Sequence, residues 1–208
     1  GFFDTFDNVL FYGEQTGGYA ACTYSVTAPG STVLALSPIS TLTPSIAGFD
    51  PRSRRAKQID FTSRYGFAPS MVEAAKDAYI VFCPQHRQES IHAAIFTRDN
   101  VTKLPAFGSA VGMSELLEEL DVLEDIIRAA MAGSLTPSVF GDQYRARREH
   151  VPYLQALMKR AIDSGHQKLA VGACAVALRE VDDPELRQIY EDLQAQLSNE
   201  ELSQANTA

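Results

Sequence analysis

A short segment in the middle of the chain contains residue types suited to nucleophilic chemistry. Cys83 is followed by Pro84, Gln85 and His86, and His92 lies six residues beyond His86. A thiol beside an imidazole can lose its proton and attack an electrophile. The segment therefore supports one hypothesis, a small cysteine-dependent or hydrolytic enzyme that uses Cys83 with His86 or His92.

The same residues also have a purely structural interpretation. A cysteine that ends an apolar strand is more often a small buried hydrophobe, and a histidine among polar residues is more often solvated. A structural zinc site needs four nitrogen or sulfur ligands close together, whereas the other cysteines and histidines are remote in the sequence. We therefore expect no metal and no cofactor, and we do not favour catalysis by this segment.

Two groups of basic residues are candidates for binding an anion or a partner. The first consists of Arg52, Arg54, Arg55 and Lys57, and the second of Arg145, Arg147 and Arg148. Clustered cations of this kind can contact phosphates or an acidic protein surface. Pairing with the chain's own carboxylates is the simpler alternative.

The distribution of charge limits the classes of partner. The 208 residues include 26 acidic and 18 basic side chains, which gives a net charge of -8. Residues 1–104 carry nine of each sign, so the whole acidic excess lies in residues 105–208. Because nonspecific nucleic-acid binding depends on cations that displace counterions, nucleic acid is a less favoured partner, with the 52–57 loop as its contact. This separation of a neutral first half from an acidic second half favours a protein partner or self-association.

Sequence motifs that would identify an enzyme class or a membrane protein are missing. The chain contains no Gly-rich phosphate loop, no Gly-x-Ser-x-Gly motif and no His-Glu-x-x-His motif. Its longest apolar run, Leu169–Leu178, has ten residues, about half the length of a membrane-spanning helix. The leading hypothesis is therefore a non-enzymatic interaction or assembly subunit. Three cysteines and no basic leader segment favour a cytoplasmic location.

Periodicity predicts a sheet-rich first half. A hairpin is expected over residues 9–26 with its turn at Gly17-Gly18, and further strands over 32–36, 79–83 and 91–97. Ser70 and Glu73 have the spacing of a capping box, which predicts one helix over 71–77.

After about residue 112 the apolar period changes to that of helices. Helices are expected over 114–133, after Pro137, over 153–163 and 167–180, and from Pro184 onward. The predicted fold is α+β, with a mostly antiparallel sheet and one helix in residues 1–108 and a bundle of four to five helices in residues 109–208.

Overall fold

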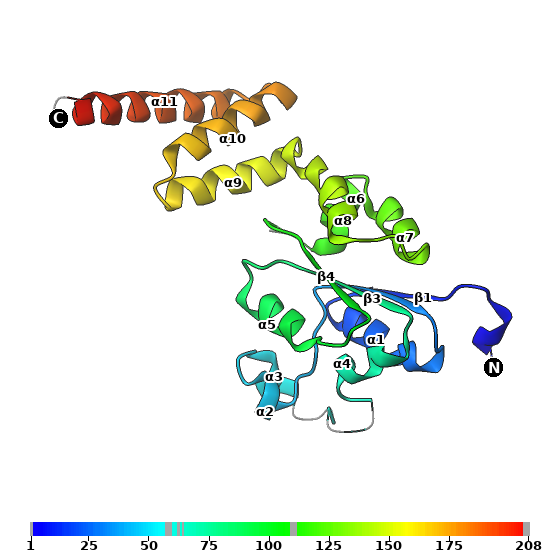
Figure 1. Cartoon of the computed structure of the whole chain (residues 1–208). Coiled ribbons are helices and arrows are strands. Elements are labelled where there is room, and N and C mark those ends of the chain that lie inside the picture. The colour runs from blue at the N-terminus through cyan, green and yellow to red at the C-terminus, as the bar shows by residue number, and fades with distance from the viewer. Residues whose placement is uncertain (1, 57–59, 62, 64, 109–111, 206–208) are drawn as a thin grey trace. The chain divides into compact units, whose positions relative to one another are not determined.

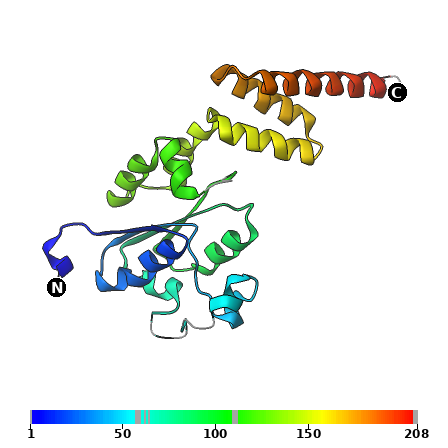
Figure 2. The same cartoon turned by 180° about the vertical axis from the view of Figure 1, so that it is seen from behind.

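The computed structural model describes residues 2–56, 60–61, 63, 65–108 and 112–205. The chain divides into two compact units, Gly1–Tyr144 and Arg145–Ala208. The first contains a sheet with helices on both faces, and the second contains helices (Figures 1 and 2). None of the described helices is both long enough and apolar enough to cross a membrane.

Four parallel strands form the centre of the first unit. They are β1 (Leu10–Glu14), β2 (Thr32–Leu36), β3 (Asp77–Phe82) and β4 (Val101–Pro105), and they lie side by side in that order. Leu34 of β2 pairs with Tyr12 of β1 and with Tyr79 of β3. Every residue of β2 is buried, as is usual for an inner strand of a parallel sheet covered on both faces.

One face of the sheet is covered by the helices that connect the strands. These are α1 (Thr16–Tyr24), α4 (Ala68–Met71) and α5 (Arg87–Ile95). Val33 and Ala35 of β2 point to this face and share a core with Cys22 of α1 and Phe96 just after α5. The connection from β2 to β3 also contains the short helices α2 (Pro44–Ala47) and α3 (Arg52–Arg55).

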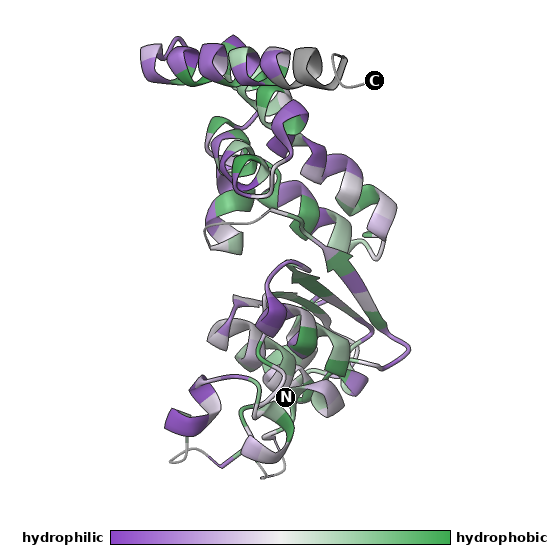
Figure 3. Ribbon diagram, turned by 90° about the vertical axis from the view of Figure 1, so that its left-hand side faces the viewer, coloured by the Kyte–Doolittle hydropathy of each residue, from purple (hydrophilic) through white to green (hydrophobic). Residues whose placement is uncertain are grey.

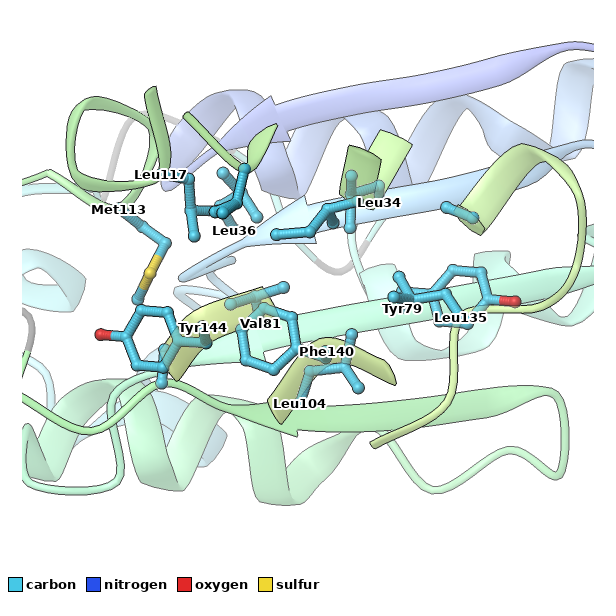
Figure 4. Packing of buried hydrophobic residues seen from close by; sticks show 14 of the residues in the cluster. Leu34, Leu36, Tyr79, Val81, Leu104, Met113, Leu117, Leu135, Phe140 and Tyr144 are labelled. Carbon is cyan, nitrogen blue, oxygen red and sulfur yellow. The ribbon is translucent and has the colours of Figure 1, made fainter. Parts of the chain in front are cut away.

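The opposite face is covered by helices that follow the last strand. They are α6 (Met113–Glu119), α7 (Leu123–Met131) and α8 (Pro137–Gln143). Figure 4 shows Leu34 and Leu36 of β2 facing this side, where Leu117 and Phe140 belong to the same buried cluster. Alternate residues of β2 thus enter two different cores, because successive side chains of a strand point to opposite faces.

The second unit consists of α9 (Val151–Asp163), α10 (Gln167–Glu180) and α11 (Pro184–Ala205). Helix α10 packs against both of the others. It does so with small buried side chains, Ala170, Ala173, Cys174 and Ala177. In Figure 3 the strands of the first unit are largely green, whereas α11 is mostly purple. The described residues also include 3-10 segments over Phe2–Thr5, Ser25–Thr27, Val72–Ala74 and Tyr144–Arg148.

The predicted α+β fold with a mostly antiparallel sheet is wrong. All three strand pairings are parallel, and the fold of the first unit is α/β. The expected hairpin over 9–26 is a strand followed by α1, and the expected strand over 91–97 lies largely in α5. Parallel neighbours need a crossover between them, and helices rather than tight turns provide it.

The predicted single bundle of four to five helices in residues 109–208 is also wrong. Helices α6 to α8 share a core with the sheet, and α9 to α11 have a core of their own. The helix expected over 114–133 is interrupted at Asp121, whose φ of 55° is left-handed. The expected capping box is absent as well, because Phe67 precedes α4 and Ser70 lies inside it.

Candidate functional site

The carboxyl ends of β1, β2 and β3 meet at one edge of the sheet, where they border a polar pocket of about 310 Å³. Its walls include Gln15, Ser37, Asp50, Arg52, His86 and Glu89. Ligands of open parallel sheets bind outside the carboxyl ends of the strands. The pocket is therefore the first place in this unit to look for a binding site.

The turn from β1 into α1 is strained and closely packed. Gln15 has φ 49° and ψ -109°, a backbone conformation that a residue with a side chain rarely adopts. Its N–H donates to the Leu36 carbonyl at 2.8 Å, which keeps the turn attached to β2. A methyl group on Gly13 would lie 2.5 Å from the carbonyl carbon and oxygen of Gly17. Glycine is therefore needed at position 13.

This strand, strained apex and helix form the backbone geometry of a nucleophile elbow. The Gly13-x-Gln15-x-Gly17 spacing matches that turn, but glutamine occupies the apex. A carboxamide has neither the hydroxyl nor the thiol that covalent catalysis uses. A search for the serine motif misses the turn, and the two glycines were the signal that could have revealed it.

Glu14, next to the apex, points to the other face of the sheet. Its carboxylate accepts hydrogen bonds from the backbone N–H groups of Met113, at 2.6 Å, and Ser114, at 3.2 Å. These N–H groups lie in the first turn of α6, where helices favour a negative charge. Consecutive residues 14 and 15 therefore have separate tasks, one in the packing of α6 and one in the pocket.

A second strained residue ends β2 and helps to position a carboxylate. Ser37 has φ 45°, and its Oγ donates to Glu89 Oε2 at 2.7 Å. The Cys83 N–H donates to the same oxygen at 2.9 Å. The His86 Nδ1 lies 2.7 Å from the other oxygen, Oε1. Because an ionised carboxylate only accepts, Nδ1 carries a proton, and in the neutral tautomer of such a ring Nε2 is the acceptor.

Asp50 and Arg52 form a charged pair in the same pocket. Arg52 donates to the Asp50 carboxylate from its backbone N–H at 2.8 Å, and from Nε at 2.9 and 3.0 Å and Nη2 at 2.6 Å. Burial by itself raises the pKa of Asp50, but hydrogen bonds from Arg52 and His92 outweigh it and lower the pKa from 3.8 to about 2. Asp50 is therefore a fixed anion that orients the guanidinium.

Behind this pair, Ser40, His92 and Asp50 form a continuous hydrogen-bonded chain. The Ser40 Oγ lies 2.8 Å from His92 Nδ1, and His92 Nε2 lies 3.0 Å from Asp50 Oδ2. The Ser40 backbone N–H also donates to Nδ1, at 3.2 Å, so the ring proton lies on Nε2. Burial lowers the pKa of His92, and Asp50 opposes that shift.

The three residues of this hydrogen-bonded series have the same types as a serine protease triad. Their exposure to solvent differs from that of a catalytic triad. Ser40, His92 and Asp50 are all buried, with at most 1% of each exposed. A nucleophile has to reach its substrate, whereas this hydroxyl is enclosed. The hydrogen bonds among these residues instead hold the segment after β2 against α5.

The structure separates the three residues proposed from the sequence for nucleophilic chemistry. Cys83 is fully buried, and its Sγ lies 4.0 Å from Gln85 Oε1. His86 pairs with Glu89, and His92 with Asp50. Among the described residues, no hydrogen bond joins the Cys83 thiol to either imidazole. His86 alone of the three lines the pocket.

The basic residues proposed for anion or partner binding also occupy different places. Arg52 lines the pocket, whereas Arg54 and Arg55 are exposed on α3, and Lys57 lies outside the described residues. Arg145, Arg147 and Arg148 belong to the second unit. There the Arg147 guanidinium lies 5.7 Å from the centre of the Tyr153 ring, within the range of a cation–π interaction.

Metal ligation has no support within the part of the chain that the structure describes, where no three His, Cys, Asp or Glu side chains are grouped to hold an ion.

The chain matches no protein-family model, no curated protein and no solved structure. Evidence on the function of the first unit therefore comes from the residues of the pocket itself.

Proposed function

We propose that the first unit binds a small anion in the pocket at the carboxyl edge of the sheet, with the Arg52 guanidinium as its main contact. The observation that carries this proposal is the difference in exposure among the charged side chains. The Arg52 side chain is 45% exposed, against 1% for Asp50 and 23% for Glu89. A ligand entering the pocket therefore meets the cation more directly than either carboxylate.

The orientation of Arg52 also favours binding. Asp50 engages Nε and Nη2, and among the described residues Nη1 has no hydrogen-bond partner. Because the side chain is already held, an anion that contacts Nη1 does not have to immobilise it. Such preorganisation lowers the entropic cost of binding.

The strained backbone gives independent support. Three described residues other than glycine have positive φ, and two of them, Gln15 and Ser37, line this pocket. Strained residues of this kind cost on the order of 1–3 kcal/mol each and cluster at functional sites. Both lie immediately after parallel strands, where ligands of this type of sheet bind.

Acetate is a suitable probe, followed by ¹H–¹⁵N NMR of the full chain. With four heavy atoms it can gain at most about 6 kcal/mol, which limits the dissociation constant to about 0.04 mM or weaker, and we expect a value on the order of a millimolar. Gln88→Trp should abolish binding by filling the pocket from an exposed position of α5. Arg87→Trp adds the same side chain to the preceding residue, which is outside the pocket lining, and should retain binding.

A second pair of variants tests the charge. Asp50→Asn with Arg52→Gln replaces the ion pair by two amides and should weaken acetate binding at least tenfold, whereas Arg54→Gln should not. Absence of saturable shifts in the unaltered chain would overturn the proposal. Binding that survives both Gln88→Trp and the double replacement would place the anion elsewhere.

Assembly through protein contacts, the leading hypothesis from the sequence, remains a separate proposal. It is favoured by the exposed Arg54 and Arg55 on α3 and by the acidic excess of residues 105–208. Light scattering of the unaltered chain and of an Arg54→Glu, Arg55→Glu variant tests it. A monomer in both cases would contradict self-association. We also propose a cytoplasmic location, since Cys22, Cys83 and Cys174 are all free thiols.

A further inference from the structure

We propose that the anion bound in the pocket is a small hydroxy acid, whose carboxylate contacts Arg52 and whose hydroxyl donates to His86 Nε2. This inference rests on the proposed anion site and adds the second half of the ligand. His86 lines the same pocket as Arg52, and its side chain is 47% exposed. An acceptor held in a binding pocket can receive a hydrogen bond from a ligand that carries a donor, in place of water.

The network around Glu89 determines which ring nitrogen accepts. Ser37 Oγ and the Cys83 N–H both donate to Oε2, and His86 Nδ1 donates to Oε1 at 2.7 Å. The hydrogen bonds from Ser37 and Cys83 therefore hold the carboxylate in place for its contact with the imidazole. A histidine whose Nδ1–H is held by a carboxylate presents Nε2 as its acceptor, as in metal sites and proton relays.

The donor of the ligand is inferred to be neutral. Ser37, Cys83 and His86 already donate to the two oxygens of Glu89, so this carboxylate makes its hydrogen bonds within the protein rather than with a ligand. His86 lines the pocket, and among the described residues its Nε2 has no hydrogen-bond partner. A hydroxyl matches it, whereas an ammonium group would bring a second cation into a pocket that contains Arg52.

Glycolate and acetate differ by one hydroxyl group, so their ratio of affinities isolates this contact. A hydrogen bond of ordinary strength makes glycolate bind about five- to tenfold more tightly than acetate. His86→Phe should reduce the ratio to about one. Arg87→Phe, at the next residue on the exposed surface, should leave the ratio as it is.

Imidazole ¹⁵N NMR gives a readout that a structural role alone would not change. In the free protein His86 should show a protonated Nδ1 and an unprotonated Nε2, and the Nε2 resonance should shift with glycolate but not with acetate. Glu89→Gln should mix the two ring tautomers and lower the preference for glycolate, because an amide can donate to Nδ1 as well as accept from it.

The outcomes separate this inference from the function on which it rests. Failure of acetate to bind refutes the anion site. Acetate binding with equal affinity for glycolate, or a preference that survives His86→Phe, refutes only the hydroxy-acid inference. Glycine that binds more tightly than glycolate would show that the wall selects an ammonium group, and would also overturn it.

Discussion

Replacing Gly13 by alanine tests the elbow geometry most directly. The added methyl group would lie 2.5 Å from both the carbonyl carbon and the oxygen of Gly17, nearly 1 Å closer than ordinary contact. Overpacking of a close-packed interior costs about 1–3 kcal/mol, and backbone on both sides leaves little room to relax. Reduced chain entropy in the unfolded state returns only about 0.4–1 kcal/mol. Because the contact is with backbone, the cost lies at the upper end of the first range, and we expect a net destabilisation of about 2 kcal/mol.

Gly17→Ala provides the matched control within the same turn. A methyl group there meets nothing within 4 Å, and position 17 lies inside α1. Alanine is the better helix former by about 0.8–1 kcal/mol, so this variant should be slightly more stable than the unaltered chain. The two substitutions make the same chemical change, yet their stabilities should differ by about 3 kcal/mol.

The measurement is urea unfolding followed by NMR signals assigned to the first unit, so that the second unit does not contribute. A difference of about 3 kcal/mol corresponds to a difference of roughly 1–3 M in the urea midpoint, since the slope m is about 1–3 kcal/mol/M. Equal stabilities of Gly13→Ala and Gly17→Ala would refute the close approach of residues 13 and 17. The elbow would then not exist as described.

Three further predictions concern other parts of the molecule. The pKa of Asp50 is lower folded, at about 2, than its ordinary 3.8, so its stabilising effect is present above about pH 4 and is lost toward pH 2. Urea unfolding between about pH 5 and pH 2 should show the unaltered chain losing about 2 kcal/mol more than Asp50→Asn, and parallel curves would contradict this. Gln15→Cys should place a thiol at the amino end of α1, where a thiolate is favoured. Iodoacetamide should label it much faster than the three buried native cysteines, as measured by mass spectrometry of the peptides. Faster labelling of the native cysteines would contradict the prediction. In the second unit, Gly172→Ala should stabilise by about 0.5–1 kcal/mol, since nothing lies within 4 Å of the added methyl. Ala177→Leu should destabilise by about 1–3 kcal/mol through overpacking, and thermal unfolding by circular dichroism would detect a reversed order.

Elements with one strong periodic signal could be predicted from the sequence. The strand over 32–36 and the helix over 167–180 have the predicted boundaries. The first is a short apolar run between turn residues, and the second combines a continuous apolar run with good helix formers. In both cases local propensity and tertiary environment favour the same structure.

Helix α1 could not be predicted in this way. Its sequence, TGGYAACTY, contains two glycines, two tyrosines and two threonines, all of which are weak helix formers. Packing decides the outcome, because Ala21 and Cys22 are buried in the same cluster as Val33 of β2. With α1 formed, β1 and β2 must be parallel, and this is why one mistaken hairpin changed the whole sheet.

The site was predictable in part. Arg52 and His86 were identified as candidates from the types of their neighbours, but their partners were not. Ser37 and Glu89 are 52 residues apart, and no local pattern links them. Parallel strands bring them together, since the carboxyl ends of β2 and β3 lie at the same edge. An antiparallel sheet would have placed those two ends at opposite edges.

The glutamine at the apex of the elbow bears on the choice between binding and hydrolysis. The pocket has the strained strand-to-helix turn and the carboxylate-held imidazole that hydrolases combine, but residue 15 supplies no nucleophile and Cys83 is buried. The Ser37 hydroxyl of the pocket donates to Glu89 rather than to His86, so hydrolysis with His86 as the base would use water as the nucleophile. Such a reaction also requires a donor for the developing oxyanion, and it would make the ester of a hydroxy acid a substrate rather than a ligand. Binding of free glycolate without turnover of glycolate esters would therefore assign the pocket to recognition rather than to hydrolysis.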